Sequence, residues 1–360
     1  MKSDILVIGG GIAGLSAAAR MSAQGKVTVL EAEEATGYHA SGRSAALFEI
    51  TYGHPIGVML NEASKDYHMT AHGGVLSPRG LMIVARAEED AAFEKDLAEM
   101  HMTEIGIDAA RALIPILNPE TVARAGHHDE AWDIDTDLLM QNFIRDLRGN
   151  GGQVLTRQRV TAIRRAGDLW QVETGAGEVF EAGILVNAAG AWVDHVAQMA
   201  GVAPLGFTPK RRSMARLPAP GGHDVSRWPM VFACGERWYA RPDAGKLLVS
   251  PSEADPAEPH DAWADDMVLA EGLARYEEMV TEPVTRLVAS WAGLRTFAPD
   301  DALVIGPDPD QPAFFWHAGQ GGTGFQTSPA ASQLAADILA GRVPEMGADI
   351  ARQLSPARFR

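Results

Sequence analysis

The sequence predicts an α/β protein (α+β overall), in which a Rossmann-like domain is interleaved with a second domain built on a mixed β-sheet. Three observations predict this fold. Residues 4–8 form a short apolar strand that runs directly into a glycine-rich turn, a helix and a second strand over 27–30. Residues 182–192 form a further apolar strand of the buried parallel type, which ends in small residues. No long linker separates these segments, so the two domains must be interleaved rather than joined in series.

The turn after the first strand has the spacing of a dinucleotide-binding motif, and it reads GGGIAG. Gly9 permits the tight turn, Gly11 lets the backbone approach a pyrophosphate, and Gly14 lets helix and strand pack closely. The helix N-terminus then offers free N–H groups to the phosphates. Glu31 ends the second strand, where it can accept hydrogen bonds from an adenosine ribose. The predicted cofactor-binding residues of this unit are Gly9, Gly11, Ile12, Ala13, Gly14 and Glu31. The alternative is a structural turn without a ligand.

The loop over 37–46 indicates which dinucleotide is bound. It is rich in small residues and hydroxyl groups and contains one arginine. Such a loop suits a cofactor that lies extended across the protein, with its pyrophosphate and isoalloxazine flanked by Ser41, Arg43 and Ser44. An ordinary surface loop is the alternative.

Composition narrows the class of protein. The 360 residues carry 31 basic and 47 acidic side chains, a formal charge of −16, which disfavours nucleic acid and anionic lipid as partners. One cysteine, Cys234, excludes an internal disulfide, and the scattered histidines show no metal-binding spacing. No apolar run approaches the ~20 residues that span a membrane. The first strand begins within a few residues of Met1, so we expect no signal peptide and a cytoplasmic location.

The rest of the chain is expected to alternate between the two domains. Residues 87–105 have the pattern of a charged amphipathic helix, and a helix over 138–147 follows the capping pair Asp135-Thr136. Short β-like runs fill 205–290. The predicted division is a discontinuous FAD-binding domain over 1–72, 140–204 and 291–360, and a substrate-binding domain over 73–139 and 205–290.

Six motifs in order resemble the D-amino-acid oxidase superfamily of flavoproteins. They read GGGIAG, a glutamate after the second strand, SGRSAA, LVNAAGAW, WAGLR and GQGGTGFQTSP. The chain is most similar to the D-arginine, or broad-specificity D-amino-acid, dehydrogenase branch, and the resemblance extends to the segment LSPARF near the C-terminus. It implies an FAD-binding domain and a substrate domain whose mixed sheet covers the flavin.

The resemblance also implies how FAD is held. Val160 would contact the adenine through its backbone, and the 319–324 turn would direct its N–H groups and a helix N-terminus to the N1–C2=O edge of the flavin. FAD is expected to be bound without a covalent bond, although His39 is an alternative attachment point. The further cofactor-binding residues are Ala40, Ser41, Arg43, Ser44, Ala45, Val160, Ala188, Gly190, Trp192, Arg295, Gly319, Gly321, Gly322, Thr323 and Gly324.

Four residues match the catalytic groups of the family. Oxidation of an α-amino acid requires a fixed carboxylate, and the planar fork of a guanidinium binds a carboxylate through two parallel bonds. Arg212 and Arg295 match the carboxylate-binding arginines, and Tyr52 and Tyr239 match phenols that line the same site. For each of the four, a structural role is the alternative.

The sequence departs from the D-arginine pattern where the substrate side chain would lie. Leu81 replaces the acidic residue and Leu47 replaces a histidine, which makes the pocket apolar and a buried cation costly. A neutral or hydrophobic substrate side chain is therefore expected. Glu49 lies on the same loop and either faces this pocket, where it would favour a basic substrate, or faces solvent. The predicted pocket residues are Leu47, Glu49, Leu81 and Gly322.

The expected reaction is FAD-dependent oxidative deamination of a D-amino acid. Hydride passes from Cα to flavin N5, and the imino acid hydrolyses to a 2-oxo acid and ammonia. No general base is assigned. The alternatives are oxidation of a secondary amine such as sarcosine or a cyclic imino acid, of glycine or of a 2-hydroxy acid, and a flavin-containing binding subunit without turnover. The electron acceptor stays open between a quinone, an electron-transfer protein and oxygen.

Overall fold

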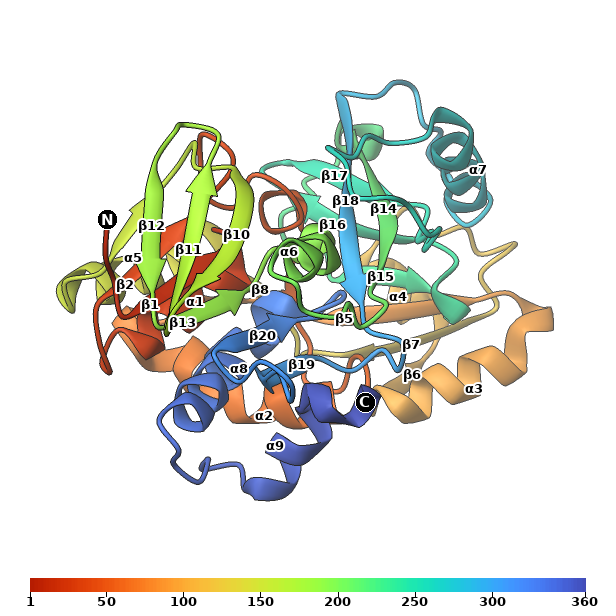
Figure 1. The fold of residues 1–360 in the computed structure, drawn as a ribbon. Coiled ribbons are helices and arrows are strands. Elements are labelled where there is room, and N and C mark those ends of the chain that lie inside the picture. The colour runs from red at the N-terminus through yellow and green to blue at the C-terminus, as the bar shows by residue number, and fades with distance from the viewer.

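A six-stranded sheet carries the glycine-rich turn in the computed structural model, which describes all 360 residues (Figure 1). Its strands are parallel except at the β19 edge. Across the sheet they are β19 (Val304–Pro307), β20 (Phe314–Ala318), β13 (Ile184–Asn187), β1 (Ile5–Ile8), β2 (Val27–Leu30) and β9 (Gln153–Leu155). The mixed α/β fold predicted from the sequence is confirmed.

Alternate residues of β1 face two different hydrophobic layers, which explains why this strand is apolar throughout. Ile5 and Val7 pack with three helices, and Leu6 and Ile8 pack with a small antiparallel sheet on the other face. The helices are α1 (Ile12–Met21), α5 (Thr136–Gly149) and α8 (Gly324–Leu339). The small sheet consists of β10 (Val160–Ala166), β11 (Leu169–Thr174) and β12 (Val179–Ala182).

A second, eight-stranded sheet forms the other half of the molecule. It is mixed, because β5 pairs in parallel with β15 while the other pairs are antiparallel. In order its strands are β18 (Ala289–Phe297), β14 (Thr208–Leu217), β17 (Lys246–Ser250), β16 (Tyr239–Asp243), β15 (Met230–Ala233), β5 (Leu81–Ala85), β7 (Arg124–His128) and β6 (Thr103–Ile105). One face packs against α4 (Ile107–Leu113) and α7 (Asp266–Glu277).

The prediction of one helix over 87–105 is wrong. The structure has a short 3-10 turn, helix α3 (Asp90–Glu99) and then strand β6. The apolar spacing of three and four does mark a helical face in α3, because Phe93 on that face is buried under the large sheet. Pairing with β7 overrides the helical pattern after residue 102, because the edge of the sheet supplies hydrogen-bond partners that sequence periodicity does not reveal.

A second small sheet and α2 (Pro55–Thr70) lie beside the junction of the two halves. The sheet contains β3 (Leu47–Phe48), β8 (Trp132–Ile134) and β4 (Leu76–Pro78). The remaining helices are α6 (Val193–Met199) and α9 (Ala348–Leu354).

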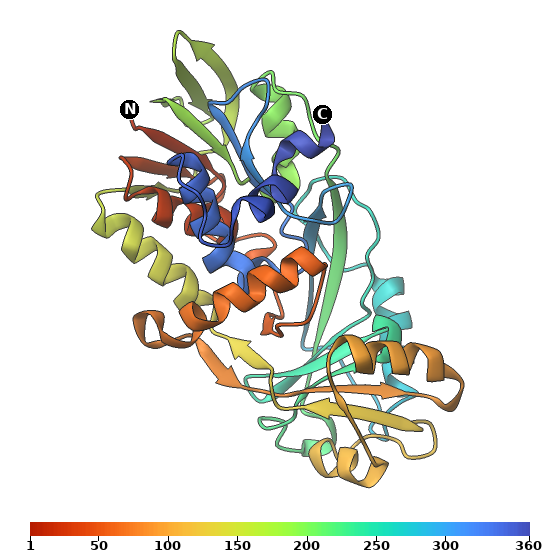
Figure 2. The ribbon, with the colours of Figure 1, turned by 90° about the horizontal axis from the view of Figure 1, so that it is seen from below.

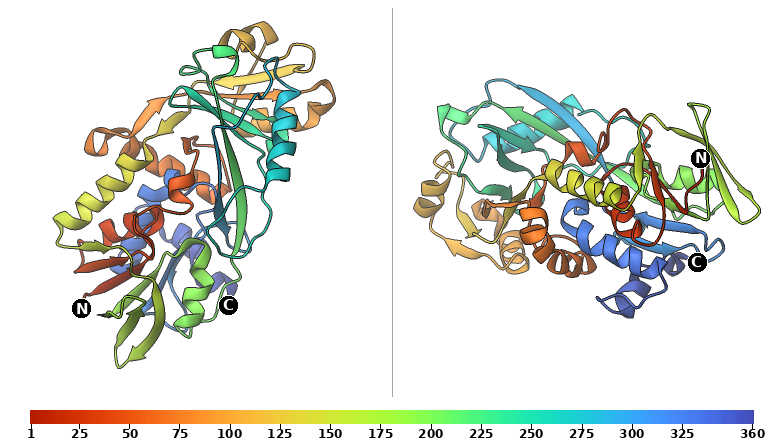
Figure 3. Two further views of the ribbon diagram at one scale, coloured as in Figure 1. Left: turned by 90° about the horizontal axis from the view of Figure 1, so that it is seen from above. Right: turned by 90° about the vertical axis from the view of Figure 1, so that its left-hand side faces the viewer.

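The two large sheets occupy opposite parts of an elongated molecule (Figure 3, left). Figure 2 shows the N-terminal and C-terminal segments together in the part that carries the six-stranded sheet. The chain therefore leaves this sheet and returns to it, as an interleaved arrangement requires. None of the helices combines the length and the apolar character that crossing a membrane requires.

Candidate active site

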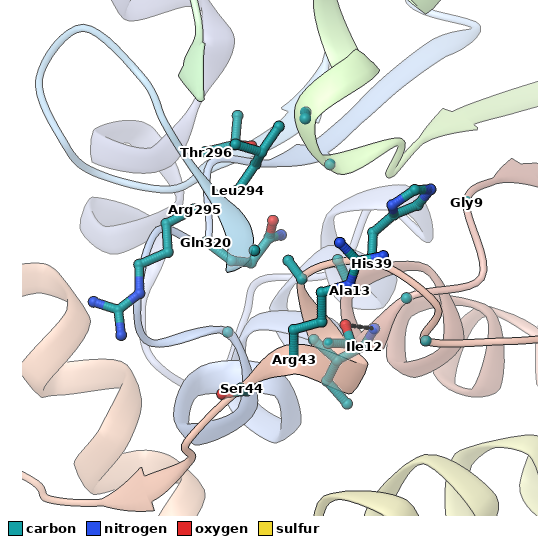
Figure 4. A pocket seen from close by; sticks show the side chains of 18 of the residues that line it. Gly9, Ile12, Ala13, His39, Arg43, Ser44, Leu294, Arg295, Thr296 and Gln320 are labelled. Atoms are coloured by element: carbon teal, nitrogen blue, oxygen red, sulfur yellow. Dashed lines mark hydrogen bonds between the residues drawn. The ribbon is translucent and has the colours of Figure 1, made fainter. Parts of the chain in front are cut away.

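One elongated cavity runs from the glycine-rich turn to the eight-stranded sheet. Its lining combines residues from β1, β2, the loop over 37–46, β14, β18, the start of α8 and the segment that directly follows β13. Figure 4 shows His39 and Arg295 on opposite sides of this cavity, with Ile12, Ala13 and Arg43 between them. A cavity with this path suits an extended dinucleotide, with a second compound bound at its far end.

The glycine-rich turn is packed too closely to accept any side chain at two positions. Gly9 has a φ of +110°, and a Cβ there would lie 2.3 Å from the carbonyl oxygen of Ala188. A Cβ on Gly14 would lie 1.9 Å from the carbonyl oxygen of Gly9. Only glycine fits at these two positions. Gly9 lines the cavity and Gly14 does not, so Gly14 contributes close packing between helix and strand.

Glu31 marks the nucleotide end of the cavity. Its side chain is 7% exposed and accepts hydrogen bonds from the backbone N–H groups of Gly10 at 2.7 Å and Glu33 at 2.8 Å. These bonds fix the carboxylate while it lines the cavity, where it can still accept a ribose hydroxyl. Val160 lines the same end of the cavity.

The N-terminus of α1 provides the phosphate site. Its cap residue, Gly11, offers no side-chain hydrogen bond to the first turn, and Ile12 and Ala13 line the cavity. The Ile12 N–H donates to Ser41 Oγ at 3.0 Å (Figure 4). Free N–H groups, the helix dipole and a serine hydroxyl form a site that fits a pyrophosphate.

Arg43 connects the loop over 37–46 to residues of the second large sheet and of the segment that follows β17. Its guanidinium forms an ion pair with Asp261 and donates to the carbonyl oxygens of Ala262 at 2.7 Å and Ala292 at 3.0 Å. These bonds hold the loop against the segment that follows β17. Ser44 and Ala45, further along the same loop, line the cavity between the two domains.

The start of α8 reaches the cavity where the sequence predicts the flavin. Gly321, Gly322 and Gly324 line it, and the cap residue Thr323 makes no side-chain bond to the helix. Thr296 also lines the cavity, and its buried Oγ1 has no hydrogen-bond partner in the protein. A buried hydroxyl is normally paired, so Thr296 is an additional residue suited to hold the cofactor.

Two arginines lie at the far end, on the neighbouring strands β14 and β18. Arg212 donates through Nε to the carbonyl oxygen of Glu253 at 2.8 Å, and Arg295 lies on the paired strand. Burial alone would lower the pKa of Arg295, but Tyr239, Tyr52 and Glu236 outweigh this and raise the pKa. Both guanidinium groups line the cavity, so a carboxylate could bind between charged, oriented donors.

Two phenols lie beside these arginines. The Tyr52 hydroxyl donates to Glu236 at 3.4 Å, and the Tyr239 hydroxyl donates to Met214 Sδ at 3.3 Å. Burial, followed by the charge of Glu236, raises the pKa of Tyr52, which therefore stays protonated and able to donate. No sequence pattern points to Glu236, because it lies far from Tyr52 in the chain and reaches it only through the turn between β15 and β16.

The wall next to the phenols is apolar. Leu47 and Leu81 belong to one buried cluster with Met214, Met230 and Phe232, and all five line the cavity. This arrangement agrees with the apolar pocket predicted from Leu47 and Leu81. The other three residues could be suspected only from alternation in strands, which does not show which face of the sheet meets the cavity.

Glu49 faces this wall rather than solvent. The residue is 4% exposed and lines the cavity. Thr51 donates to Oε1 through its N–H at 3.1 Å and its hydroxyl at 2.8 Å, and His128 Nε2 lies 3.1 Å from Oε2. Of the two orientations considered from the sequence, the solvent-facing one is wrong.

The structure brings almost all of the predicted site residues to one cavity. Those lining it are Gly9, Gly11, Ile12, Ala13, Glu31, Ala40, Ser41, Arg43, Ser44, Ala45, Leu47, Glu49, Tyr52, Leu81, Val160, Ala188, Gly190, Trp192, Arg212, Tyr239, Arg295, Gly321, Gly322 and Gly324. Gly14, Gly319 and Thr323 lie outside the lining. The direct binding role of each residue stays a prediction.

Known proteins share this sequence pattern and this architecture. The family model described as FAD dependent oxidoreductase (DAO) matches residues 4–338. FAD-dependent oxidoreductase domain-containing protein 1 of Bos taurus is 25% identical over 406 residues, covering 94% of this chain and 81% of the bovine protein. Glycine oxidase of Pseudomonas putida is 25% identical over 368 residues, covering 96% of each protein. Among solved structures, L-alpha-glycerophosphate oxidase of Mycoplasma pneumoniae with FAD bound has a TM-score of 0.82 at 20% identity, covering 94% of this chain and 95% of that chain.

Proposed function

The chain belongs to the DAO family of FAD-dependent oxidoreductases, and from this premise we propose that it oxidises free D-amino acids with neutral side chains at Cα. FAD is its cofactor, which confirms the prediction made from the glycine-rich turn and the loop that follows. The observation that carries the proposal is the pair of arginines, Arg212 and Arg295, at the end of the cavity opposite the nucleotide site.

Arg212 and Arg295 are the residues proposed to bind the substrate carboxylate. The Nε of Arg212 is already bonded to Glu253, which leaves its terminal nitrogens to meet the substrate. Arg295 stays charged because its neighbours raise its pKa despite burial. A carboxylate held by two oriented guanidinium groups has little freedom to rotate, which fixes the direction of Cα.

Bound FAD supplies the oxidising chemistry by accepting hydride at N5 from Cα of the substrate. The protein residues position the substrate and exclude water. The protonated Tyr52 phenol can donate its one hydrogen to the substrate in place of Glu236, and Phe232 stacks against the Tyr52 ring with ring centroids 6.4 Å apart. The amine is proposed to be neutral when the Cα–H bond breaks, so the imino acid forms without a dedicated base. Its hydrolysis yields a 2-oxo acid and ammonia.

The preference for a neutral side chain rests on the apolar wall. Leu47 and Leu81 are buried in one cluster with Met214 and Met230. Glu49 also lines this wall, but its Oε1 already accepts two hydrogen bonds from Thr51, so an ammonium or guanidinium would lose its water and leave most of its donors unpaired. We also propose a preference for the D-enantiomer, which the sequence resemblance to the D-arginine dehydrogenase branch supports.

A second candidate is oxidation of glycine or of a secondary amine such as sarcosine or a cyclic imino acid. Glycine oxidase of Pseudomonas putida, which matches over nearly the whole of both chains, favours it. These compounds would bind to the same two arginines and leave the apolar side-chain pocket empty or partly filled. A 2-hydroxy acid would use the same arginines but also needs a base for its hydroxyl proton, and no base is assigned here.

FAD is proposed to bind without a covalent bond. Cys234 does not line the cavity. His39 does line it, but on the opposite side from Arg295 (Figure 4). Its Nε2 lies 3.2 Å from Glu33 Oε1, and the centroids of the His39 and Trp192 rings are 4.6 Å apart. Precipitation of the protein with acid should therefore release all of the FAD into the supernatant.

The test is anaerobic reduction of the bound flavin. The purified protein is mixed with neutral and basic D-amino acids, their L-enantiomers, glycine, sarcosine, proline and 2-hydroxy acids, and the loss of oxidised-flavin absorbance is followed. Rapid bleaching by neutral D-amino acids, with little from D-arginine, supports the proposal. Bleaching confined to sarcosine, proline or glycine supports the second candidate, and bleaching by none of the amino compounds contradicts both. Admission of air then shows whether oxygen or another acceptor is required.

A further inference from the structure

Three buried polar atoms without hydrogen-bond partners meet behind the apolar wall. They are Oε2 of Glu49 and both ring nitrogens of His128. Oε2 lies 3.1 Å from His128 Nε2, a distance that allows an ion pair, but the two groups are not aligned as a hydrogen bond. Of the two, only Glu49 reaches the cavity lining. Natural cores rarely leave such atoms unpaired, so this cluster calls for a functional explanation.

The position of Glu49 is fixed from several elements. Its N–H donates to Gln326 Oε1 at 2.7 Å, and Gln326 belongs to α8. Asn61 of α2 donates to the carbonyl oxygens of the turn at Ile50 and Tyr52, at 3.2 and 3.3 Å. The carboxylate is therefore held on the same short turn that carries Tyr52, close to the substrate end of the cavity.

His128 connects this carboxylate to the side-chain pocket. It lies on β7 directly opposite Leu81 of β5, so the two side chains are neighbours on one face of the sheet. Leu47 lies two residues before Glu49 and belongs to the same buried cluster as Leu81. The pocket wall thus combines apolar side chains with one carboxylate, and an imidazole lies behind the carboxylate.

The hydrogen-bonding capacity of this wall favours a neutral donor over a cation. An ammonium has three donors and a guanidinium has five, whereas a hydroxyl has one and an amide has two. Glu49 already uses Oε1 for Thr51, and the His128 ring lies 3.1 Å from Oε2, which leaves this carboxylate room for few further donors. Leu47 and Leu81 accept no hydrogen bonds, so most donors of a cation would stay unpaired.

We propose that Glu49, backed by His128, is the specificity-determining residue of the side-chain pocket, and that it selects amino acids whose side chain ends in a hydroxyl or amide donor. The inference rests on the proposed amino-acid oxidation and refines its substrate class from neutral to neutral with a hydrogen-bond donor. A small rotation of the carboxylate would let it accept from the substrate while it keeps its contact with Thr51 or His128.

The test compares substrates of equal shape that differ in one donor. Threonine is compared with valine, and asparagine with leucine, each as the enantiomer that the protein oxidises. In the unmodified protein, kcat/KM should favour the donor-bearing member of each pair by about tenfold or more, as expected for a hydrogen bond to a charged acceptor. In Glu49→Met this ratio should fall to near one. Glu49→Gln keeps the volume of the side chain and an acceptor oxygen, and should give an intermediate ratio.

The ratio separates recognition from a structural role. If Glu49 only supports the fold, its substitution lowers kcat/KM equally for both substrates of a pair, and the ratio of the two values stays unchanged. Glu33→Gln is the matched control, because Glu33 is a carboxylate of the same cavity at the nucleotide end, and its ratio should equal that of the unmodified protein. A ratio near one in the unmodified protein, or a higher kcat/KM for lysine or arginine than for all four compounds, overturns the inference while leaving amino-acid oxidation standing. Reduction by no amino acid contradicts the proposed function itself, and the inference with it.

Discussion

The guanidinium of Arg295 lies directly against the backbone of Gly322. A Cβ built on Gly322 would lie 3.1 Å from Nη1 and 3.3 Å from Cζ of Arg295. Gly322 belongs to the turn before α8, and Arg295 belongs to β18 of the other large sheet. The contact therefore joins the predicted flavin-binding turn to the predicted carboxylate-binding group, and a side chain on Gly322 would require the guanidinium to shift by a few tenths of an ångström.

Gly322→Ala should weaken substrate binding more than it weakens FAD binding. The added methyl group would push the arginine fork by a few tenths of an ångström. Since an error of about 1 Å in positioning can cost on the order of a hundredfold, this smaller shift should cost roughly tenfold or less. The measurement is the dissociation constant of an amino acid, obtained from the concentration dependence of anaerobic flavin reduction. Gly57→Ala is the control, because a Cβ there meets nothing within 4 Å. Equal binding in Gly322→Ala and the unmodified protein would contradict the prediction that the position of the Arg295 guanidinium limits substrate binding.

Arg212→Lys should lower kcat/KM by about a hundredfold, since lysine cannot donate to Glu253 and form a two-pronged bond to a carboxylate. Steady-state kinetics with the best amino acid measures this loss. Arg216→Lys is the matched control, because Arg216 is on the same strand, pairs with Asp243 and lies outside the cavity. A similar loss in both variants would indicate damage to β14 rather than to a binding site.

The nucleotide half of the site could be predicted from sequence because its determinants are local. Gly9, Gly11 and Glu31 lie within one strand–helix–strand unit, and their spacing alone places them together. The predicted catalytic half of the site depends on the family motifs that surround Arg212 and Arg295. Neither composition nor periodicity would have paired these arginines, which are brought together by β14 and β18.

Other parts of the site depend on contacts that sequence patterns do not show. Glu49 meets His128 only because β5 pairs with β7 and β3 pairs with β8, so its orientation had to stay open. Glu236 meets Tyr52 across the two domains. The strand β6 was mistaken for helix because its partner strand, not its own pattern, decides its structure.

Thr296→Val should weaken FAD binding by roughly fivefold, the value of one ordinary hydrogen bond. The two side chains have nearly the same shape, so the variant removes the unpaired Oγ1 with little change in packing. Dissociation constants for FAD can be measured by titrating the apoprotein and following flavin fluorescence. Thr161→Val, on an exposed strand, is the control. If Oγ1 has no partner when FAD is bound, valine should instead stabilise the protein and leave FAD affinity unchanged.

Two buried histidines should make the protein sensitive to mild acid. Burial lowers the pKa of His68 and of His317 from about 6.5 to about 4, so both are neutral in the folded protein. The unfolded chain takes up these protons as the pH falls below 6.5, and the folded protein does so only near pH 4. Stability is therefore lost across this window, by roughly 3 kcal/mol for each histidine at its lower end. The measurement is the free energy of unfolding by urea at pH 7 and at pH 5.

The drop in this free energy between the two pH values should be smaller in His317→Gln than in the unmodified protein, because the variant has one fewer buried imidazole. His223→Gln, at an exposed position, should show the same drop as the unmodified protein. Equal pH dependence in all three proteins would mean that His317 is able to take up a proton without unfolding.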